Sequence, residues 1–270
     1  MALHKKNLLW DLGNTLIKID EFAFARQMGL TDLIIYCLST GNHPRKILLR
    51  ALDFLDAIPY TRANACQTTL AGRPLPPVVC DWFAGKITDV QALHTNKSFP
   101  IIVPEGFFTN KREEHLVKNL LKTIANPAVF AHCISIIDEG LLLLEQCANQ
   151  LDEEGNNAHT LYIFSNWDKD SFNYLVQDSQ MHRLFSYFKT SHQIISGNIG
   201  YLKPGDEAFF HLLTTHNLVA SECILIDDQE ENIRAALKNG MQGILLENTN
   251  FQKVRIKLQE YGVLPPKIYE

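Results

Sequence analysis

The stretch N-L-L-W-D-L-G-N-T-L, from Asn7 to Leu16, decides the fold: a short apolar run ends at Asp11 and meets the turn residues Gly13 and Asn14. An apolar run of this length before a turn signal is typical of a strand buried on both faces, as in a parallel sheet. Asp11 would then lie at the carboxyl end of the strand. Because that end of an open α/β sheet carries the ligand-binding loops, Asp11 is the first candidate site residue.

Three later stretches also end an apolar run with polar residues. They are Thr160 to Phe164 before Ser165-Asn166, Gly200 to Leu202 before Lys203-Pro204, and Cys223 to Ile226 before Asp227-Asp228, with Asn232 following. Neighbouring strands in one sheet would bring these ends together, and carboxylates, an ammonium, a hydroxyl and an amide suit a metal ion and a phosphate. Asp227 and Asp228 alone could instead cap the helix that follows them.

Composition narrows the class of protein. The chain has 270 residues, 46% of them hydrophobic, which is enough for one large domain or two modest ones. Its 25 basic and 30 acidic residues give a formal charge of −5, which argues against a nucleic-acid partner. With no apolar run of membrane-span length and no signal-peptide core, we expect a cytoplasmic protein with no membrane partner. The six cysteines form no C-x-x-C pair, so we expect reduced thiols and no zinc site. The sequence does not indicate an oligomeric state.

Hydrophobic periodicity divides the chain. Between Asp20 and about Asn126 apolar residues recur at helical spacing, which predicts helices around residues 30–38, 47–55, 78–84 and 111–124. Beyond this, a long helix is expected to about Leu151, a short strand at Phe188 to Thr190, and helices at residues 206–216 and 229–239. The alternation of strands and helices predicts a doubly wound parallel sheet in an α/β core, residues 1–17 and 127–270, with an inserted helical domain, residues 18–126.

In order, the stretches D-L-G-N-T, F-S-N, K-P and L-I-D-D-Q-E-E-N resemble motifs one to four of the haloacid dehalogenase (HAD) superfamily. The resemblance covers about half the chain and implies a Rossmann-like core with a helical cap inserted after the first motif. The D-L-G-N opening is similar to that of sugar-1-phosphatase-like members. A cap would exclude bulk water from phosphoryl chemistry and supply most substrate contacts.

The resemblance also implies roles for the acidic residues. Asp11 would attack phosphorus and form an aspartyl phosphate, which water then hydrolyses. Mg²⁺ would be held by Asp11, the carbonyl of Gly13 and Asp228, while Asp227 and Asn232 would orient ligands and waters around it.

The remaining motif residues would bind the substrate, which the resemblance implies is a small phosphorylated metabolite. Ser165 and Asn166 would hold phosphate oxygens, and Lys203 would neutralise charge on the transferring group. Trp167, next to them, could form a wall of the pocket, although packing is its more ordinary use.

Gly13 departs from the family pattern, because phosphatases of this family commonly have a second Asp, a general acid, at that position. Losing such an acid costs roughly 10²- to 10⁴-fold for a poor leaving group, and less for an acidic one such as a sugar 1-phosphate. Asp20, Glu21 or a cap residue could substitute. Two alternatives to a phosphatase therefore stay open: a non-catalytic binding protein on the same scaffold, and a metal-independent carbon–halogen hydrolase.

Overall fold

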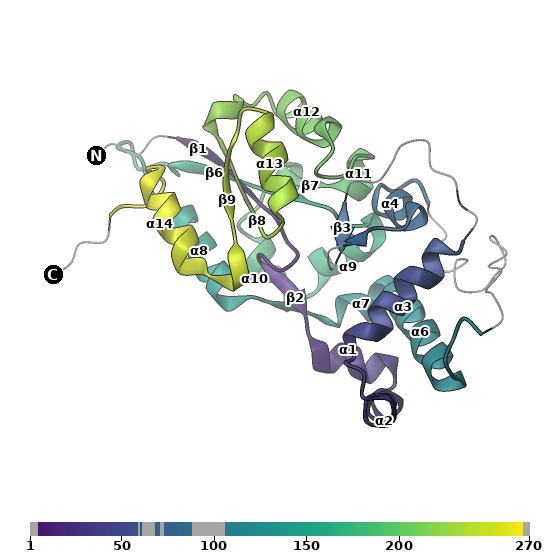
Figure 1. The fold of residues 1–270 in the computed structure, drawn as a ribbon. Helices are drawn as coiled ribbons and strands as arrows, with labels where there is room; N and C mark the ends of the chain where they lie inside the picture. The colour runs from purple at the N-terminus through teal and green to yellow at the C-terminus, as the bar shows by residue number, and fades with distance from the viewer. Residues whose placement is uncertain (1–4, 59, 61–67, 71–72, 88–105, 267–270) are drawn as a thin grey trace.

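Five parallel strands form the central sheet of the computed structural model, which describes residues 5–58, 60, 68–70, 73–87 and 106–266 (Figure 1). Strand β1 (Lys6–Trp10) lies in the middle. On one side of it lie β6 (His159–Ser165) and β7 (Gln193–Ile195), and on the other β8 (Cys223–Asp227) and β9 (Gln242–Leu245). The sheet is therefore wound in both directions from β1, and the carboxyl end of β1 is where such sheets bind ligands.

Both faces of this sheet are buried, as parallel sheets require. Leu8 and Trp10 of β1 belong to the apolar cluster on one face, and Leu9 belongs to the cluster on the other. The first face is covered by α8 (Asp138–Ala148), α9 (Lys169–Gln177), α10 (His182–Phe185) and α14 (Phe251–Glu260). The second is covered by α12 (Asp206–Thr215) and α13 (Glu230–Lys238). This continuous burial fixes the position of each strand end.

A helical insert with its own apolar cluster lies beside the carboxyl edge of the sheet (Figure 1). Its described elements are α1 (Glu21–Met28), α2 (Leu30–Thr40), α3 (Arg45–Asp56), α4 (Pro77–Phe83), α6 (Lys111–Ile124) and the hairpin of β3 (Thr69–Leu70) with β4 (Arg73–Pro74). The chain leaves the sheet through β2 (Ile17–Ile19) and returns through α7 (Pro127–Ala131) and β5 (Ile134–Ile136). Because β2 and β5 pair antiparallel, both connections to the insert lie side by side.

The predicted fold class is confirmed, and the helices predicted in the insert correspond to α2, α3, α4 and α6. The domain boundaries at residues 18 and 126 stay a prediction. Among the described residues, no helix combines the length and apolar character needed to cross a bilayer.

Four local predictions are wrong. The long helix predicted to Leu151 is instead α7, β5 and α8, because Ile134–Ile136 pairs with β2 as a strand. The strand expected at residues 188–190 lies at Gln193–Ile195. Gly200 to Leu202 is not a strand but follows the short helix α11 (Ser196–Ile199). Cys37, Cys133, Cys147 and Cys223 are free thiols as expected, but Cys80 is disulfide-bonded.

Candidate active site

A tight turn directly after β1 sets the position of Asp11. The N–H of Asp11 donates to the carbonyl of Ile226 on β8 at 3.0 Å, so the two strand ends are joined at this point. The carbonyl of Leu12 then accepts the N–H groups of Thr15, Leu16 and Ile17. Asn14 takes a left-handed conformation with φ of 55°, which Asn tolerates better than most residues. The turn thereby leaves the Asp11 carboxylate at the edge of the sheet with 7% of the residue exposed.

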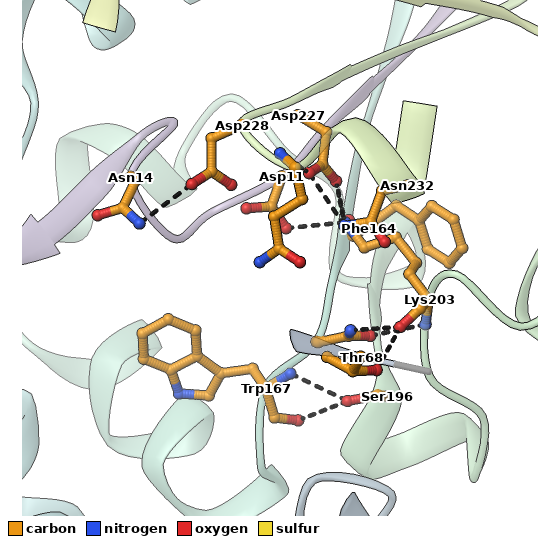
Figure 2. Close-up of polar contacts among 12 residues, drawn as sticks. Asp11, Asn14, Thr68, Phe164, Trp167, Ser196, Lys203, Asp227, Asp228 and Asn232 are labelled. Carbon is orange, nitrogen blue, oxygen red and sulfur yellow. Dashed lines mark hydrogen bonds and ion pairs between the residues drawn. The ribbon is translucent and has the colours of Figure 1, made fainter. Parts of the chain in front are cut away.

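Lys203 brings two of the predicted carboxylates together (Figure 2). Its Nζ lies 2.8 Å from Oδ1 of Asp11 and 2.6 Å from Oδ2 of Asp227, and it also donates to the carbonyl of Phe164 at 2.7 Å. The lysine side chain is 1% exposed. All three donors of its ammonium are therefore used, and it cannot leave the site without exposing two buried carboxylates.

Asp227 has no free carboxylate oxygen. Its Oδ1 accepts the N–H of Gln229 at 2.9 Å and the amide of Asn232 at 3.0 Å. Its Oδ2 accepts Lys203 and, at 3.1 Å, Asn232 again. Asp227 thus holds the lysine and the residue before α13 at the same time. The helix-cap interpretation is wrong, because the N-cap of α13 is Gln229 and its side chain makes no capping hydrogen bond.

Asp228 is placed differently from Asp227. Its Oδ2 accepts the side-chain amide of Asn14 at 3.1 Å, whereas its Oδ1 is buried without a hydrogen-bond partner among the described residues. One carboxylate oxygen from each of Asp11, Asp227 and Asp228 lies within 4.8 Å of the other two. An unpartnered buried carboxylate oxygen is costly, and a cation beside it would remove that cost.

The electrostatics show an excess of negative charge. Burial raises the pKa of Asp11 to about 7, with Asp227 and Asp228 adding to the shift and Lys203 opposing it. Burial and Asp227 raise the pKa of Asp228 to about 6. Burial alone would lower the pKa of Lys203, but Asp11 and Asp227 outweigh it and raise that pKa. A protonated Lys203 and three carboxylates would carry a formal charge of +1 − 3 = −2 when all are ionised, which matches a divalent cation.

The second predicted motif lies at the same edge. Ser165 is the last residue of β6 and is 3% exposed. The side chain of the next residue, Asn166, hydrogen-bonds the backbone of Lys203. Oδ1 of Asn166 accepts the N–H of Lys203, and Nδ2 of Asn166 donates to the carbonyl of Lys203, both at 2.8 Å. Ser165 therefore lies at the strand end, whereas the amide of Asn166 is already bonded to the backbone of Lys203.

Other residues considered from the sequence have structural uses. Trp167 stacks on Phe130 with ring centroids 6.1 Å apart, and its indole N–H is buried without a partner among the described residues. The carboxylate of Asp20 caps α1 by accepting the N–H of Ala23 at 2.9 Å, and Glu21 lies in the first turn of that helix. At Gly13 an added Cβ would meet only Oδ2 of Asp11, at 3.9 Å, so the position of the missing acid is sterically open.

Three polar residues that the sequence did not single out connect the site to its surroundings. Asn14 holds Asp228, Thr68 of the insert donates to the carbonyl of Lys203 at 2.6 Å, and Ser196 donates to the carbonyl of Phe83 on α4 at 2.7 Å. Asn14 could have been found, because it lies in the turn after Asp11. Thr68 and Ser196 lie outside every motif, so no local signal indicates them.

No model of a protein family matches this sequence. Among solved structures, a HAD family enzyme of Bacteroides thetaiotaomicron has a TM-score of 0.51 and 17% identity, with 90% of this chain and 93% of that chain covered. The complex of that enzyme with magnesium and inorganic phosphate also has a TM-score of 0.51 and 17% identity, over 89% of this chain and 93% of that chain. The chain therefore has the Rossmann-like fold of HAD family enzymes.

Proposed function

We propose that the chain is a Mg²⁺-dependent phosphomonoesterase that hydrolyses a small phosphorylated metabolite through Asp11. The observation that carries the proposal is the placement of one buried ammonium, Lys203, between Asp11 and Asp227 while Asp228 keeps an unpartnered oxygen. The magnesium and inorganic phosphate bound by the Bacteroides enzyme of the same fold support the same assignment. In this proposal the helical insert acts as a cap over the site.

The donor set fits Mg²⁺, which prefers a few hard oxygen ligands and keeps several waters. Asp11 and Asp228 would supply carboxylate oxygens. Gly13, in the turn after β1, would supply its backbone carbonyl. Asp227 would orient ligands and waters instead, because its two oxygens together already accept four hydrogen bonds. Bound Mg²⁺ would supply the positive charge that lets an anionic phosphate approach Asp11.

The chemistry assigned to the protein's own residues has two displacements. In the first, a carboxylate oxygen of Asp11 attacks phosphorus, the bond to the leaving oxygen breaks, and that oxygen takes a proton from water. In the second, water attacks phosphorus, loses a proton to solvent, and releases phosphate with the Asp11 carboxylate restored. Lys203 stays protonated throughout and stabilises charge on the transferring group.

The open position at Gly13 narrows the substrate. Without a general acid, alkoxide leaving groups of high pKa are slow by roughly 10²- to 10⁴-fold, so leaving oxygens of lower pKa are favoured. Sugar 1-phosphates and aryl phosphates have leaving oxygens of this more acidic kind. We therefore propose an anomeric sugar phosphate, or a phosphate ester of similar leaving-group acidity, as the substrate class.

The test is hydrolysis of para-nitrophenyl phosphate with Mg²⁺ by the wild type, Asp11→Asn and Asp206→Asn. Asp206 lies on α12, where it pairs with Lys238. We expect activity in the wild type and the Asp206 variant and none in Asp11→Asn. Activity in Asp11→Asn would refute the nucleophile. Mg²⁺ binding without turnover across a panel of metabolites would favour the binding-protein alternative, for which Gly13 is the supporting residue, and halide release without Mg²⁺ would favour a dehalogenase.

A further inference from the structure

The backbone of Lys203 is held from two separate parts of the chain. Asn166, directly after β6, hydrogen-bonds both the N–H and the carbonyl of Lys203 through its side chain. Thr68, in the helical insert, donates its hydroxyl to the same carbonyl at 2.6 Å. The carbonyl oxygen therefore accepts one hydrogen bond from the residue after β6 and one from the insert. Figure 2 shows the contact of Thr68 with Lys203.

These contacts lie in the protein interior. Thr68 is 4% exposed, and Lys203 is 1% exposed. Leu202, the residue before the lysine, packs in the apolar cluster of the insert rather than in either cluster of the sheet. Because water cannot easily replace a hydroxyl in a buried site, loss of the Thr68 hydroxyl leaves the lysine backbone with one fewer restraint.

We propose that Thr68 is a positioning residue for Lys203, through which the helical insert aligns the ammonium between Asp11 and Asp227. This inference rests on the proposed function, in which Lys203 stabilises the transferring phosphoryl group. The hydrogen bonds of the ammonium, at 2.8 and 2.6 Å, are at the short end of the usual range. A shift of the backbone by a fraction of an ångström would lengthen them, and transition-state stabilisation depends steeply on such placement.

The neighbouring residue provides a matched control. Thr69 also links the insert to the core, but its hydroxyl hydrogen-bonds Oε1 of Glu231 on α13. The hairpin that carries both threonines is tied to α3 by Arg73, which pairs with Asp53 and Asp56. Removing either hydroxyl removes one insert–sheet contact, but only Thr68 acts on the lysine.

The experiment compares Thr68→Val, Thr68→Ser and Thr69→Val with the wild type, using para-nitrophenyl phosphate with Mg²⁺. We expect Thr68→Val to lower kcat roughly five- to tenfold with KM within about twofold, as for one lost buried hydrogen bond that acts on the chemical step. Thr68→Ser keeps the hydroxyl and should have the kcat of the wild type. The kcat of Thr69→Val should stay within about twofold of the wild-type value. Should Thr68→Val fail to fold, Thr68→Ala takes its place.

Hydrogen exchange of the Lys203 amide supplies a measurement that does not need activity. This N–H is bonded to Asn166, and we expect it to exchange about fivefold faster in Thr68→Val but not in Thr69→Val. Equal kcat losses in the two valine variants, a change in KM alone, or unchanged exchange in Thr68→Val would each overturn the proposal. An inactive wild type would instead count against the phosphatase function, and the exchange comparison would still decide the role of Thr68.

Discussion

Lys203 and Asp227 form the shortest ion pair at the sheet edge, with 2.6 Å between Nζ and Oδ2, against 2.8 Å between Nζ and Oδ1 of Asp11. Both partners are buried, at 1% and 0% side-chain exposure. Because Asn232 and the N–H of Gln229 complete the hydrogen bonds of Asp227, this aspartate serves as an anchor for the lysine. In the proposed function, Asp11 is then the partner of Lys203 that reacts.

Replacement of Lys203 by Met should cost both stability and activity. It removes the ammonium that faces two buried carboxylates, and breaking a buried ion pair from one side costs about 3–5 kcal/mol. We expect the free energy of unfolding in urea to fall by about 3 kcal/mol and phosphate hydrolysis to be lost. Lys238→Met is the control, because its pair with Asp206 is exposed to solvent and contributes little to stability. An equal free energy of unfolding in the two variants would contradict a stabilising role for the buried ion pairs of Lys203 with Asp11 and Asp227.

Magnesium should stabilise the folded protein through Asp228. A ligand that binds only the folded state raises the free energy of unfolding by about 2.7 kcal/mol at 100 times its Kd. We expect MgCl₂ to raise the Tm of the wild type, but not that of Asp228→Asn, relative to KCl at equal ionic strength. Asp206→Asn, on the surface, should respond like the wild type. A full magnesium response in Asp228→Asn would remove this residue from the metal site.

Three of the four strand ends could be predicted because their signal is local. Asp11, Ser165 and Asp227 each follow or end an apolar run of at least three residues, and β1, β6 and β8 are adjacent in the sheet. An apolar run buried on both faces has few alternatives to a parallel strand. Their convergence then follows from the sheet itself, since carboxyl ends of parallel strands meet at one edge.

The position of Lys203 could not be predicted in the same way. Gly200 to Leu202 is too short a run to specify a strand, and the apolar side chain of Leu202 is taken up by the insert. Likewise the composition of Ile134–Ile136 is like that of the helices beside it, so composition does not mark a strand. The strand forms because it pairs with β2, which lies far away in the sequence. Such choices are made by tertiary packing, which outweighs local propensity.

Gly13→Asp should add the missing general acid. Gly13 does not have a positive φ, and an added Cβ would meet only Oδ2 of Asp11 at 3.9 Å, so the backbone and the space both accept a side chain. We expect hydrolysis of alkyl phosphates to rise relative to para-nitrophenyl phosphate by at least about tenfold, because an acid matters most for a poor leaving group. Gly13→Asn has the same size without a proton to donate and should leave the ratio unchanged. An equal gain in both variants would point to packing rather than acid catalysis.

A pH-dependent term in stability should come from His159, far from these motifs. Its Nε2 lies 3.0 Å from the carbonyl of Val263, its Nδ1 is buried without a partner among the described residues, and burial lowers its pKa below the ordinary 6.5. Between the lowered pKa and 6.5 the unfolded chain binds more protons than the folded one, so the free energy of unfolding rises with pH there. The stabilisation is complete above 6.5 and is lost on acidification.

The measurement is the difference in unfolding free energy between the wild type and His159→Gln from about pH 5 to 8, a range that brackets the ordinary pKa of histidine. The difference is needed because Asp11 and Asp228, with raised pKa values, titrate in both proteins and act in the opposite sense: their stabilising contribution falls as the pH rises. We expect the advantage of the wild type to shrink steadily below pH 6.5, the ordinary value for this histidine. A difference that stays constant with pH would show that His159 protonates equally well in the folded and unfolded chain, against the burial of its ring.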